Sequence, residues 1–216
     1  MSNQGKLLVV SGFSGAGKGT VMKKLMESYD NYALSISATT RSPREGEVDG
    51  REYFFKSEDE FKKMIDDGEL LEYAKYVGNY YGTPKKYVES CLDEGKNVIL
   101  EIESVGALNV KKIFPEAVLI FIVPPSADEL ERRLRGRGTE DEETIMARLS
   151  KASKESFGVE KYDYIVVNDT VDECVGVINS ITLCDENTCD LHKASNNIKL
   201  INEIREQLKV YSGGEN

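Results

Sequence analysis

The sequence predicts an α/β protein whose parallel sheet is flanked by helices, and three observations lead to this fold class. Short apolar runs end at Gly or Pro, as buried parallel strands do. Segments with apolar residues at helical spacing alternate with these runs at both ends of the chain. The middle, about residues 35–83, is richer in short strands and turns, so we expect a small, partly β insertion in the core.

The first third of the chain begins with a strand expected at 6–11, a β-rich apolar run that stops at Gly12. A helix is expected over 20–29, where four apolar residues have helical spacing. A second short strand is expected at 32–37. The stretch 39–56, rich in charge and Gly, is expected to form a loop and hairpin.

In the middle third, segment 58–68 carries its apolar residues on one face, and Gly68 fits a helix C-cap. This predicts a helix. Segment 70–76 alternates loosely and predicts a strand, and the aromatic stretch 78–82 predicts a turn. Pro84 suits the first turn of a helix that runs to residue 95.

In the last third, apolar runs again predict strands, and helical spacing predicts the helices between them. Ser126 is expected to cap the start of one helix. The expected strands lie at 97–102, 117–123 and 163–167, and the expected helices at 105–114, 126–134, 140–157 and 171–183.

Composition excludes several classes of protein. The 216 residues suit one domain or one core with a small insertion, and a net charge of −10 disfavours binding to nucleic acid or anionic membranes. No apolar run reaches the ~20 residues that span a bilayer, and the N-terminal run is too short for a signal peptide. Four cysteines indicate a reduced, cytoplasmic protein. A single histidine excludes a multi-His metal site.

One glycine-rich segment follows the first strand and opens the first helix, which is the context of a phosphate-binding P-loop. Glycines let successive N–H groups point inward, and the helix N-terminus and a lysine add positive charge. This predicts a P-loop NTPase core that binds a polyphosphate; the alternative is a plain strand-to-helix turn. The residues of the cradle are Gly12, Ser14, Gly15, Ala16, Gly17, Lys18, Gly19 and Thr20.

The loop departs from the common pattern at one position. Ser or Thr usually follows the lysine and binds Mg²⁺, whereas Gly19 stands there and Thr20 comes next. Two interpretations stay open: Thr20 serves as the magnesium ligand, or the ion is held through water.

A second anion site is expected in the stretch 37–53. Arg41 and Arg44, three residues apart, suit a clamp on one phosphate through forked hydrogen bonds. Tyr53, and Tyr81 in the aromatic stretch, would add hydroxyl donors. The alternative is a solvated polar loop.

These motifs, with Gly136-Arg137-Gly138-Thr139 further on, stand in the order found in guanylate kinases. The sequence resembles that family from about residue 6 to residue 183. The resemblance implies transfer of the γ-phosphoryl group of ATP to GMP, giving ADP and GDP with Mg²⁺. Small-molecule substrates are therefore the expected partners, and neither nucleic acid nor membrane.

For the GMP site, the resemblance implies that Arg41, Arg44, Tyr53 and Tyr81 hold the phosphate. It also implies that Glu72, Ser37 and Thr83 read guanine. A carboxylate only accepts hydrogen bonds, and guanine presents N1–H and the 2-amino group side by side, so adenine is rejected. Without the resemblance, Glu72 would be interpreted as a surface carboxylate.

For the ATP site, the resemblance implies a mobile Arg-rich lid at about 135–142. Arg137 would contact the nucleotide, Arg148 the transferring phosphate, and Asn168 would lie beside adenine. With Lys18, Arg41 and Arg44, these two arginines are the expected catalytic residues. The alternative for the lid arginines is the solvated face of a helix end.

The segment 101–106 departs from the family pattern of acidic residue, spacer, Asp, spacer, Gln, Gly. Glu103 replaces the Asp and is expected to reach GMP or a magnesium water, whereas Val105 replaces the Gln and offers no side-chain hydrogen bond. Glu101, at the end of its strand, is a candidate for organising Mg²⁺ beside Thr20.

The expected domains are a core of residues 1–34 and 84–183, a GMP-binding insertion of 35–83 and a helical tail of 184–216. Two other functions are the alternatives. A guanylate-kinase-like phosphopeptide-binding scaffold would typically lack the phosphate loop, which is intact here. A kinase for another nucleotide monophosphate or a sugar phosphate would prefer a different acceptor.

The tail beyond residue 183 holds the only histidine. Cys184, Cys189 and His192 give at most three ligands of a metal site, and the alternative is a polar linker with packing cysteines. Apolar residues at helical spacing over 198–211 then predict a helix that packs on the body or on a second subunit, as in a homodimer.

Overall fold

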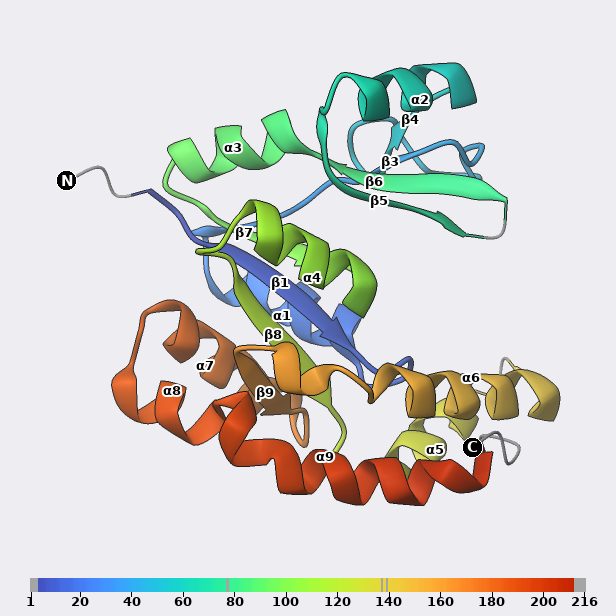
Figure 1. Ribbon diagram of the computed structural model, residues 1–216, viewed down its shortest axis with the longest axis vertical. Helices are drawn as coiled ribbons and strands as arrows, with labels where there is room; N and C mark the ends of the chain where they lie inside the picture. Colours follow the sequence, from blue (N-terminus) through green and yellow to red (C-terminus); the bar gives the residue numbers. More distant parts are fainter. Residues whose placement is uncertain (1–3, 77, 137, 139, 212–216) are drawn as a thin grey trace. The chain divides into compact units, whose positions relative to one another are not determined.

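The computed structural model describes residues 4–76, 78–136, 138 and 140–211 (Figure 1). None of the helices in these ranges combines the length and apolar character that a membrane crossing requires. The strands are β1 (Leu7–Gly12), β2 (Tyr32–Leu34), β3 (Ala38–Thr39), β4 (Phe54–Phe55), β5 (Leu70–Tyr76), β6 (Asn79–Pro84), β7 (Asn97–Glu101), β8 (Val118–Val123) and β9 (Tyr164–Val167). The helices are α1 (Lys18–Ser28), α2 (Glu58–Asp66), α3 (Lys85–Asp93), α4 (Ser104–Ile113), α5 (Ala127–Arg135), α6 (Glu142–Glu155), α7 (Val171–Thr182), α8 (Glu186–His192) and α9 (Ala194–Leu208), with short 3₁₀ turns η1 (Val159–Lys161) and η2 (Lys209–Tyr211).

The main sheet has five strands in the order β2-β7-β1-β8-β9, and the β2–β7 and β8–β9 pairs are parallel. Every residue of β1 is buried, as are five of the six residues of β8. Strands buried on both faces have continuous apolar sequences, which is why the sequence identified them. The α/β class with a parallel sheet flanked by helices is therefore confirmed.

Two compact units divide the chain, and the first comprises the residues up to Val9 and Asn31–Val118. It holds a second sheet with the strand order β4-β3-β6-β5. The β5–β6 pair is antiparallel, with a register shift between Leu70 and Tyr73. Phe61 of α2 is fully buried and stacks on Tyr80 of β6, with ring centroids 5.4 Å apart. This stack anchors α2 to the small sheet.

Two local expectations in this unit were wrong. The stretch 39–56 does not form a hairpin, because β3 and β4 pair in parallel, Ala38 with Phe54 and Thr39 with Phe55. The aromatic stretch 78–82 is mostly strand β6, which pairs along β5. Glycine and asparagine favour turns whereas tyrosine favours strands, and pairing with the neighbouring strand decides between the two.

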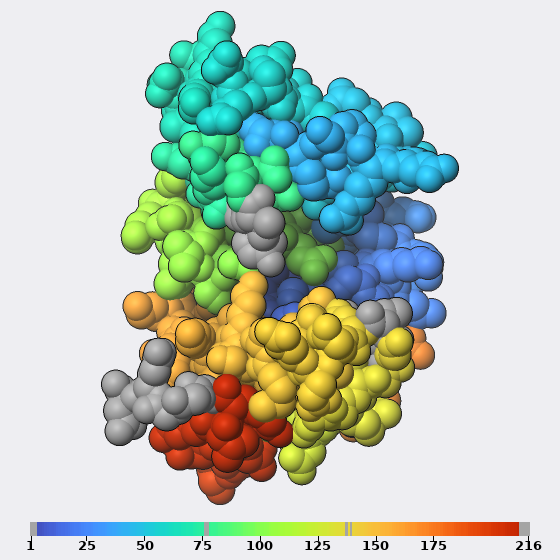
Figure 2. All heavy atoms as spheres, turned by 90° about the vertical axis from the view of Figure 1, so that its right-hand side faces the viewer, coloured from blue at the N-terminus to red at the C-terminus, as the bar shows by residue number. Residues whose placement is uncertain are grey.

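The second unit comprises Val10–Asp30 and the chain from Leu119 onward. In it, α1 packs on α7, and the helical tail α8–α9 packs on α5, α6 and α7 (Figure 1). Figure 2 shows the red atoms of α9 beside the yellow atoms of α6. Of the two expectations for the terminal helix, packing on the body is confirmed.

The segment expected as a polar linker at the start of the tail is instead helix α8. The side chain of Asp185 caps it by accepting a hydrogen bond from the backbone N–H of Thr188. A short antiparallel bridge between Tyr164 and Lys193 then joins the tail to the edge of β9. The helix lacks a fully buried residue, so its apolar pattern was too weak to predict it.

Candidate active site

The phosphate loop of the second unit joins β1 to α1 through two glycines in the left-handed region. Gly15 has a φ of 98° and Gly17 a φ of 88°. Gly17 is also the N-cap residue of α1, so the loop turns directly into a helix N-terminus. The loop is tightened by a hydrogen bond from the Ala16 N–H to the Phe13 carbonyl at 3.0 Å. This geometry presents backbone N–H groups and a positive helix end to an anion.

Lys18, the first residue of α1, folds back over this loop. Its Nζ donates to the carbonyl oxygens of Gly12 at 2.8 Å and Phe13 at 3.2 Å. The ammonium group is therefore already positioned above the loop, as the charge that a bound phosphate would meet.

Asn168, directly after β9, supports the phosphate loop through a hydrogen bond. It is 3% exposed, and its Nδ2 donates to the Ala16 carbonyl at 2.7 Å. A Cβ at position 17 would lie 2.6 Å from this Nδ2, so Gly17 is required both for its φ and for the space. The structure places Asn168 as a support of the loop, a role the sequence did not predict.

Arg148 of α6 reaches the loop as well. Its Nη1 donates to the Ser14 hydroxyl at 2.9 Å, and its Nη2 pairs with Glu140 at 2.6 Å. The Ser14 N–H in turn donates to the carboxylate of Glu155 at 3.2 Å. Glu140 and Glu155 were missed in the sequence, where nothing distinguishes them from the other surface carboxylates of a helix.

Three arginines before and at the start of the expected lid segment, Arg132, Arg133 and Arg135, lie at the end of α5. Arg132 and Arg133 both donate to Glu129, and these bonds lower the pKa of Glu129 to about 2. Arg135 pairs with Glu131 and Glu142. Arg137 lies outside the described residues, so the structure says nothing of its contacts.

In the first unit, the two arginines of the expected phosphate clamp share one carboxylate. The guanidinium of Arg41 donates to both oxygens of Glu47 at 2.9 and 3.0 Å, and the backbone N–H of Arg44 donates to Glu47 at 2.7 Å. The Arg41 bond is the main cause that lowers the pKa of Glu47. The sequence analysis missed Glu47, because a spacing of six residues in irregular structure carries no signal for a pair.

Aromatic rings surround the Arg41 guanidinium. Its Cζ lies 5.3 Å from the centre of the Tyr53 ring, and the Tyr53 and Tyr81 rings meet edge to face at 6.1 Å. The site thus brings together Arg41, Tyr53 and Tyr81, as expected, whereas the side chain of Arg44 is exposed.

Glu72 of β5 carries its carboxylate into a cavity of about 290 Å³. Its Oε1 accepts a hydrogen bond from the hydroxyl of Thr83 at 2.8 Å, and Thr83 itself is fully buried. Burial raises the pKa of Glu72 above its usual value, and the Thr83 bond opposes that shift. The cavity is also lined by Ser37, Tyr53, Tyr81, Gly82, Glu101, Glu103, Val105, Gly106 and Asn109, among others.

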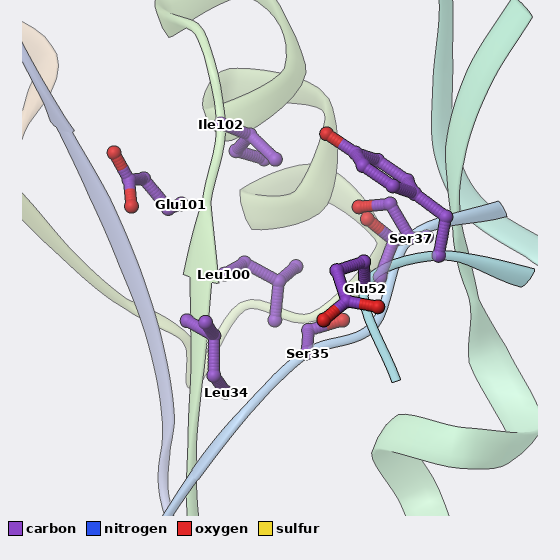
Figure 3. A pocket seen from close by; sticks show the side chains of 9 residues that line it. Leu34, Ser35, Ser37, Glu52, Leu100, Glu101 and Ile102 are labelled. Atoms are coloured by element: carbon purple, nitrogen blue, oxygen red, sulfur yellow. The ribbon is translucent and has the colours of Figure 1, made fainter. Parts of the chain in front are cut away.

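A second hollow of about 350 Å³ continues from Ser37 and Tyr53 toward β2 and β7 (Figure 3). Ser35, Ser37 and Glu52 lie together in this view. The Glu101 side chain projects on the other side of β7 from Leu100, as successive residues of a strand do. Glu101 and Ser37 nevertheless both line this hollow and the cavity that holds Glu72.

The oxygen ligands that the sequence analysis proposed suit Mg²⁺. Thr20 is an exposed hydroxyl in the first turn of α1, and Glu101 is an exposed carboxylate at the end of β7. Mg²⁺ is commonly held by one or two such groups with phosphate and water, so the donor chemistry fits. Within the described ranges, no three His, Cys, Asp or Glu side chains cluster as metal ligands, and Cys184, Cys189 and His192 do not form such a group.

A phosphate loop at the carboxyl end of a parallel strand, with an added lysine and arginine, defines a P-loop nucleotide-binding protein of the α/β class. The Guanylate kinase family profile matches residues 4–182. Guanylate kinase of Caldanaerobacter subterraneus subsp. tengcongensis is 53% identical over 193 residues, 89% of this chain and 94% of that protein. Guanylate kinase of Clostridium perfringens strain SM101 is 50% identical over 207 residues, 96% of each chain, so this likeness includes most of the tail.

Among solved structures, the guanylate kinase of Anaplasma phagocytophilum has a TM-score of 0.64 at 36% identity and covers 86% of this chain and 89% of its own. The chain belongs to the guanylate kinase family. It is therefore a kinase of nucleoside monophosphates, as the resemblance in the sequence predicted.

Proposed function

We propose that the chain transfers the γ-phosphoryl group of ATP to GMP, giving ADP and GDP, and that its two units hold one nucleotide each. The observation that carries this proposal is the half-buried carboxylate of Glu72, which lines a cavity and accepts a hydrogen bond from the buried Thr83, in a chain that also has the phosphate loop. The site residues that follow are part of the same proposal.

In the GMP site, Glu72 accepts the guanine N1–H and 2-amino hydrogen bonds, with Ser37, Thr83 and Glu103 lining the base. Adenine offers no such pair of donors and would leave a buried carboxylate unsatisfied, so it is rejected. Arg41, Arg44, Tyr53 and Tyr81 hold the GMP phosphate. On binding, the phosphate competes with Glu47 for Arg41, because both are anions that suit the same guanidinium fork.

In the ATP site, the N–H groups of residues 12–20 and the ammonium of Lys18 bind the polyphosphate. Arg148 and Arg137 stabilise the negative charge of the transferring phosphoryl group. Phosphoryl transfer needs positioning and charge stabilisation more than covalent chemistry, and these cations supply both. Residues 135–142 form the lid that excludes water during transfer.

Mg²⁺, when bound, would neutralise part of the phosphate charge. Thr20 and Glu101 are the residues of this chain that would hold it, directly or through water. The bounds proposed for the functional parts are 1–34 with 84–183 for the core, 35–83 for the GMP-binding insertion and 184–216 for the tail.

The cytoplasm is the proposed location, since none of the four cysteines forms a disulfide, as in a reducing compartment. A homodimer through the tail also stays a proposal. Its support is the exposure of Leu191 and Val210, at 68% and 76%, on a tail whose other face is buried. Light scattering coupled to gel filtration would decide between monomer and dimer.

The function is tested by GMP-dependent ADP formation in a coupled assay. Lys18→Ala is expected to lower kcat by at least about a hundredfold, the scale of one lost charge-stabilising donor. Glu72→Ala is expected to raise the KM for GMP with a smaller effect on kcat, because it acts on base binding.

Lys23→Ala is the matched control, since Lys23 lies on the exposed side of the same helix. Comparing GMP, AMP, UMP and CMP as acceptors tests the base assignment. Absence of GMP-dependent turnover in the wild type would refute the kinase, and a preference for AMP would refute the role assigned to Glu72.

A further inference from the structure

Gly106, in the first turn of α4, stands against the carboxylate of Glu72. A Cβ built at position 106 would lie 3.0 Å from Oε2 of Glu72, 3.5 Å from its Cδ and 3.3 Å from Cδ1 of Ile102. The first and last of these distances are tighter than ordinary van der Waals contact. The helix therefore approaches the carboxylate as closely as it does because residue 106 has no side chain.

Backbone conformation gives no reason for a glycine at this place. Gly106 does not adopt a positive φ and is the third residue of a regular helix, where alanine is favoured over glycine. The helix alone would prefer alanine at this position. Among the described surroundings, the tight space beside Glu72 and Ile102 is the feature that favours glycine.

The two oxygens of Glu72 are thus fixed by different neighbours. Oε1 accepts the hydrogen bond from Thr83 of β6, and Oε2 lies against the first turn of α4. The register shift in β5 between Leu70 and Tyr73 spans Leu71 and Glu72, and such irregularities redirect side chains. The carboxylate is held in one orientation inside the cavity, between strand and helix.

The position of α4 also favours the charged form of Glu72. Gly106 is the third residue of the helix, and helix N-termini stabilise a nearby negative charge. Burial raises the pKa of Glu72 and so works against the charge, and the hydrogen bond from Thr83 opposes this shift.

We infer that Gly106 is a positioning residue for base specificity: its missing side chain lets the first turn of α4 set the orientation of the Glu72 carboxylate. The inference rests on the proposed guanine site. It extends that site to a residue that makes no hydrogen bond to the base through a side chain and acts through Glu72.

The test is Gly106→Ala, measured with GMP and with inosine monophosphate, which keeps N1–H but lacks the 2-amino group. The added methyl group turns the carboxylate, so the KM for GMP should rise about tenfold, the scale of one hydrogen bond to a charged group. The preference for GMP over inosine monophosphate should fall by a similar factor. The kcat and the KM for ATP should stay within about twofold of wild type.

Two controls separate this role from a structural one. Gly176→Ala places the same methyl group inside α7, where no described atom lies within 4 Å, and should leave all constants unchanged. The melting temperature of Gly106→Ala should be equal to or above that of the wild type, because alanine favours the helix.

A double-mutant cycle with Glu72→Gln then tests the route of the effect. If Gly106 acts through Glu72, the loss caused by Gly106→Ala should largely disappear in the Glu72→Gln background. Additive effects, or an unchanged preference between the two purines in a folded Gly106→Ala protein, would overturn the inference. Failure of the wild type to use GMP would instead count against the proposed function.

Discussion

At the scale of single residues, Glu72 combines a cost to stability with a use in binding. Its carboxylate lies in a cavity, and burial raises its pKa above that of an ordinary glutamate. A carboxyl group whose pKa is higher in the folded than in the unfolded protein stabilises the folded state at pH values below its unfolded pKa. This stabilisation is lost as the pH rises through the folded pKa. At neutral pH the charged Glu72 therefore lowers the stability of the free protein.

This predicts an acid limit on GMP binding. The protonated carboxyl cannot accept both guanine donors, so the KM for GMP should rise as pH falls, starting at a higher pH than an ordinary glutamate would give. The KM for GMP measured between about pH 8 and about pH 5 checks this.

Glu72→Gln is the control for that profile. It should weaken GMP binding at every pH, remove the acid rise in KM, and stabilise the free protein by about 1 kcal/mol because no buried charge remains. A pH profile of KM that is the same in both proteins would show that another group titrates.

Arg41 and Glu47 illustrate a second point at this scale. A sequence motif identified the arginine, but its partner became visible only with the loop folded, because the two residues are six apart in irregular structure. Helical spacing rules do not apply to such pairs.

At the scale of elements, the end of α7 shows a local conflict. The N–H of Cys184 bonds to the Ile181 carbonyl and that of Asp185 to the Ser180 carbonyl, which is the Schellman pattern of helix termination. This pattern places Cys184 in the left-handed region, with a φ of 60°. A glycine normally occupies that position because a side chain is strained there.

We therefore predict that Cys184→Gly stabilises the protein by about 1 kcal/mol, the left-handed penalty of a non-glycine residue. Urea unfolding followed by circular dichroism measures it. Cys184→Ala is the matched control: it also removes the thiol but keeps the Cβ, and should give no such gain. Equal stability of the two variants would mean that the strain at this helix end is negligible.

At the scale of the whole molecule, the tail is an integral part of the second unit. Ile201, Ile204 and Leu208 of α9 are at most 1% exposed. Arg205 donates to the carbonyl of Ser156 just after α6, and the Tyr211 hydroxyl donates to Glu131 of α5. The tail thus joins the two helices on either side of the proposed lid.

Shortening a buried side chain on this apolar face of α9 should destabilise the second unit. Ile204→Ala is expected to lower the free energy of unfolding by about 2–4 kcal/mol, from lost burial and the cavity that remains. Glu203→Ala, one residue away on the exposed face, should change it by less than about 0.5 kcal/mol. A loss below about 1 kcal/mol for Ile204→Ala would mean that α9 is only loosely attached in solution.

The sequence by itself determined the parallel α/β core, the phosphate loop and the family. Each depends on local patterns: continuous apolar strands, glycines beside a lysine, and helical spacing. These patterns are visible in the linear sequence because neighbouring residues in the chain produce them.

Only the tertiary structure decided which residues meet across elements. Examples are the parallel pairing of β3 with β4, the support of the phosphate loop by Asn168, and the contact of Gly106 with Glu72. Strand pairing and close approach depend on residues far apart in the chain, and burial then fixes the hydrogen bonds and the pKa of the groups brought together. In the sequence, a glycine in a predicted helix indicates only a lower helix propensity. In the structure, the same glycine leaves room for the carboxylate of Glu72.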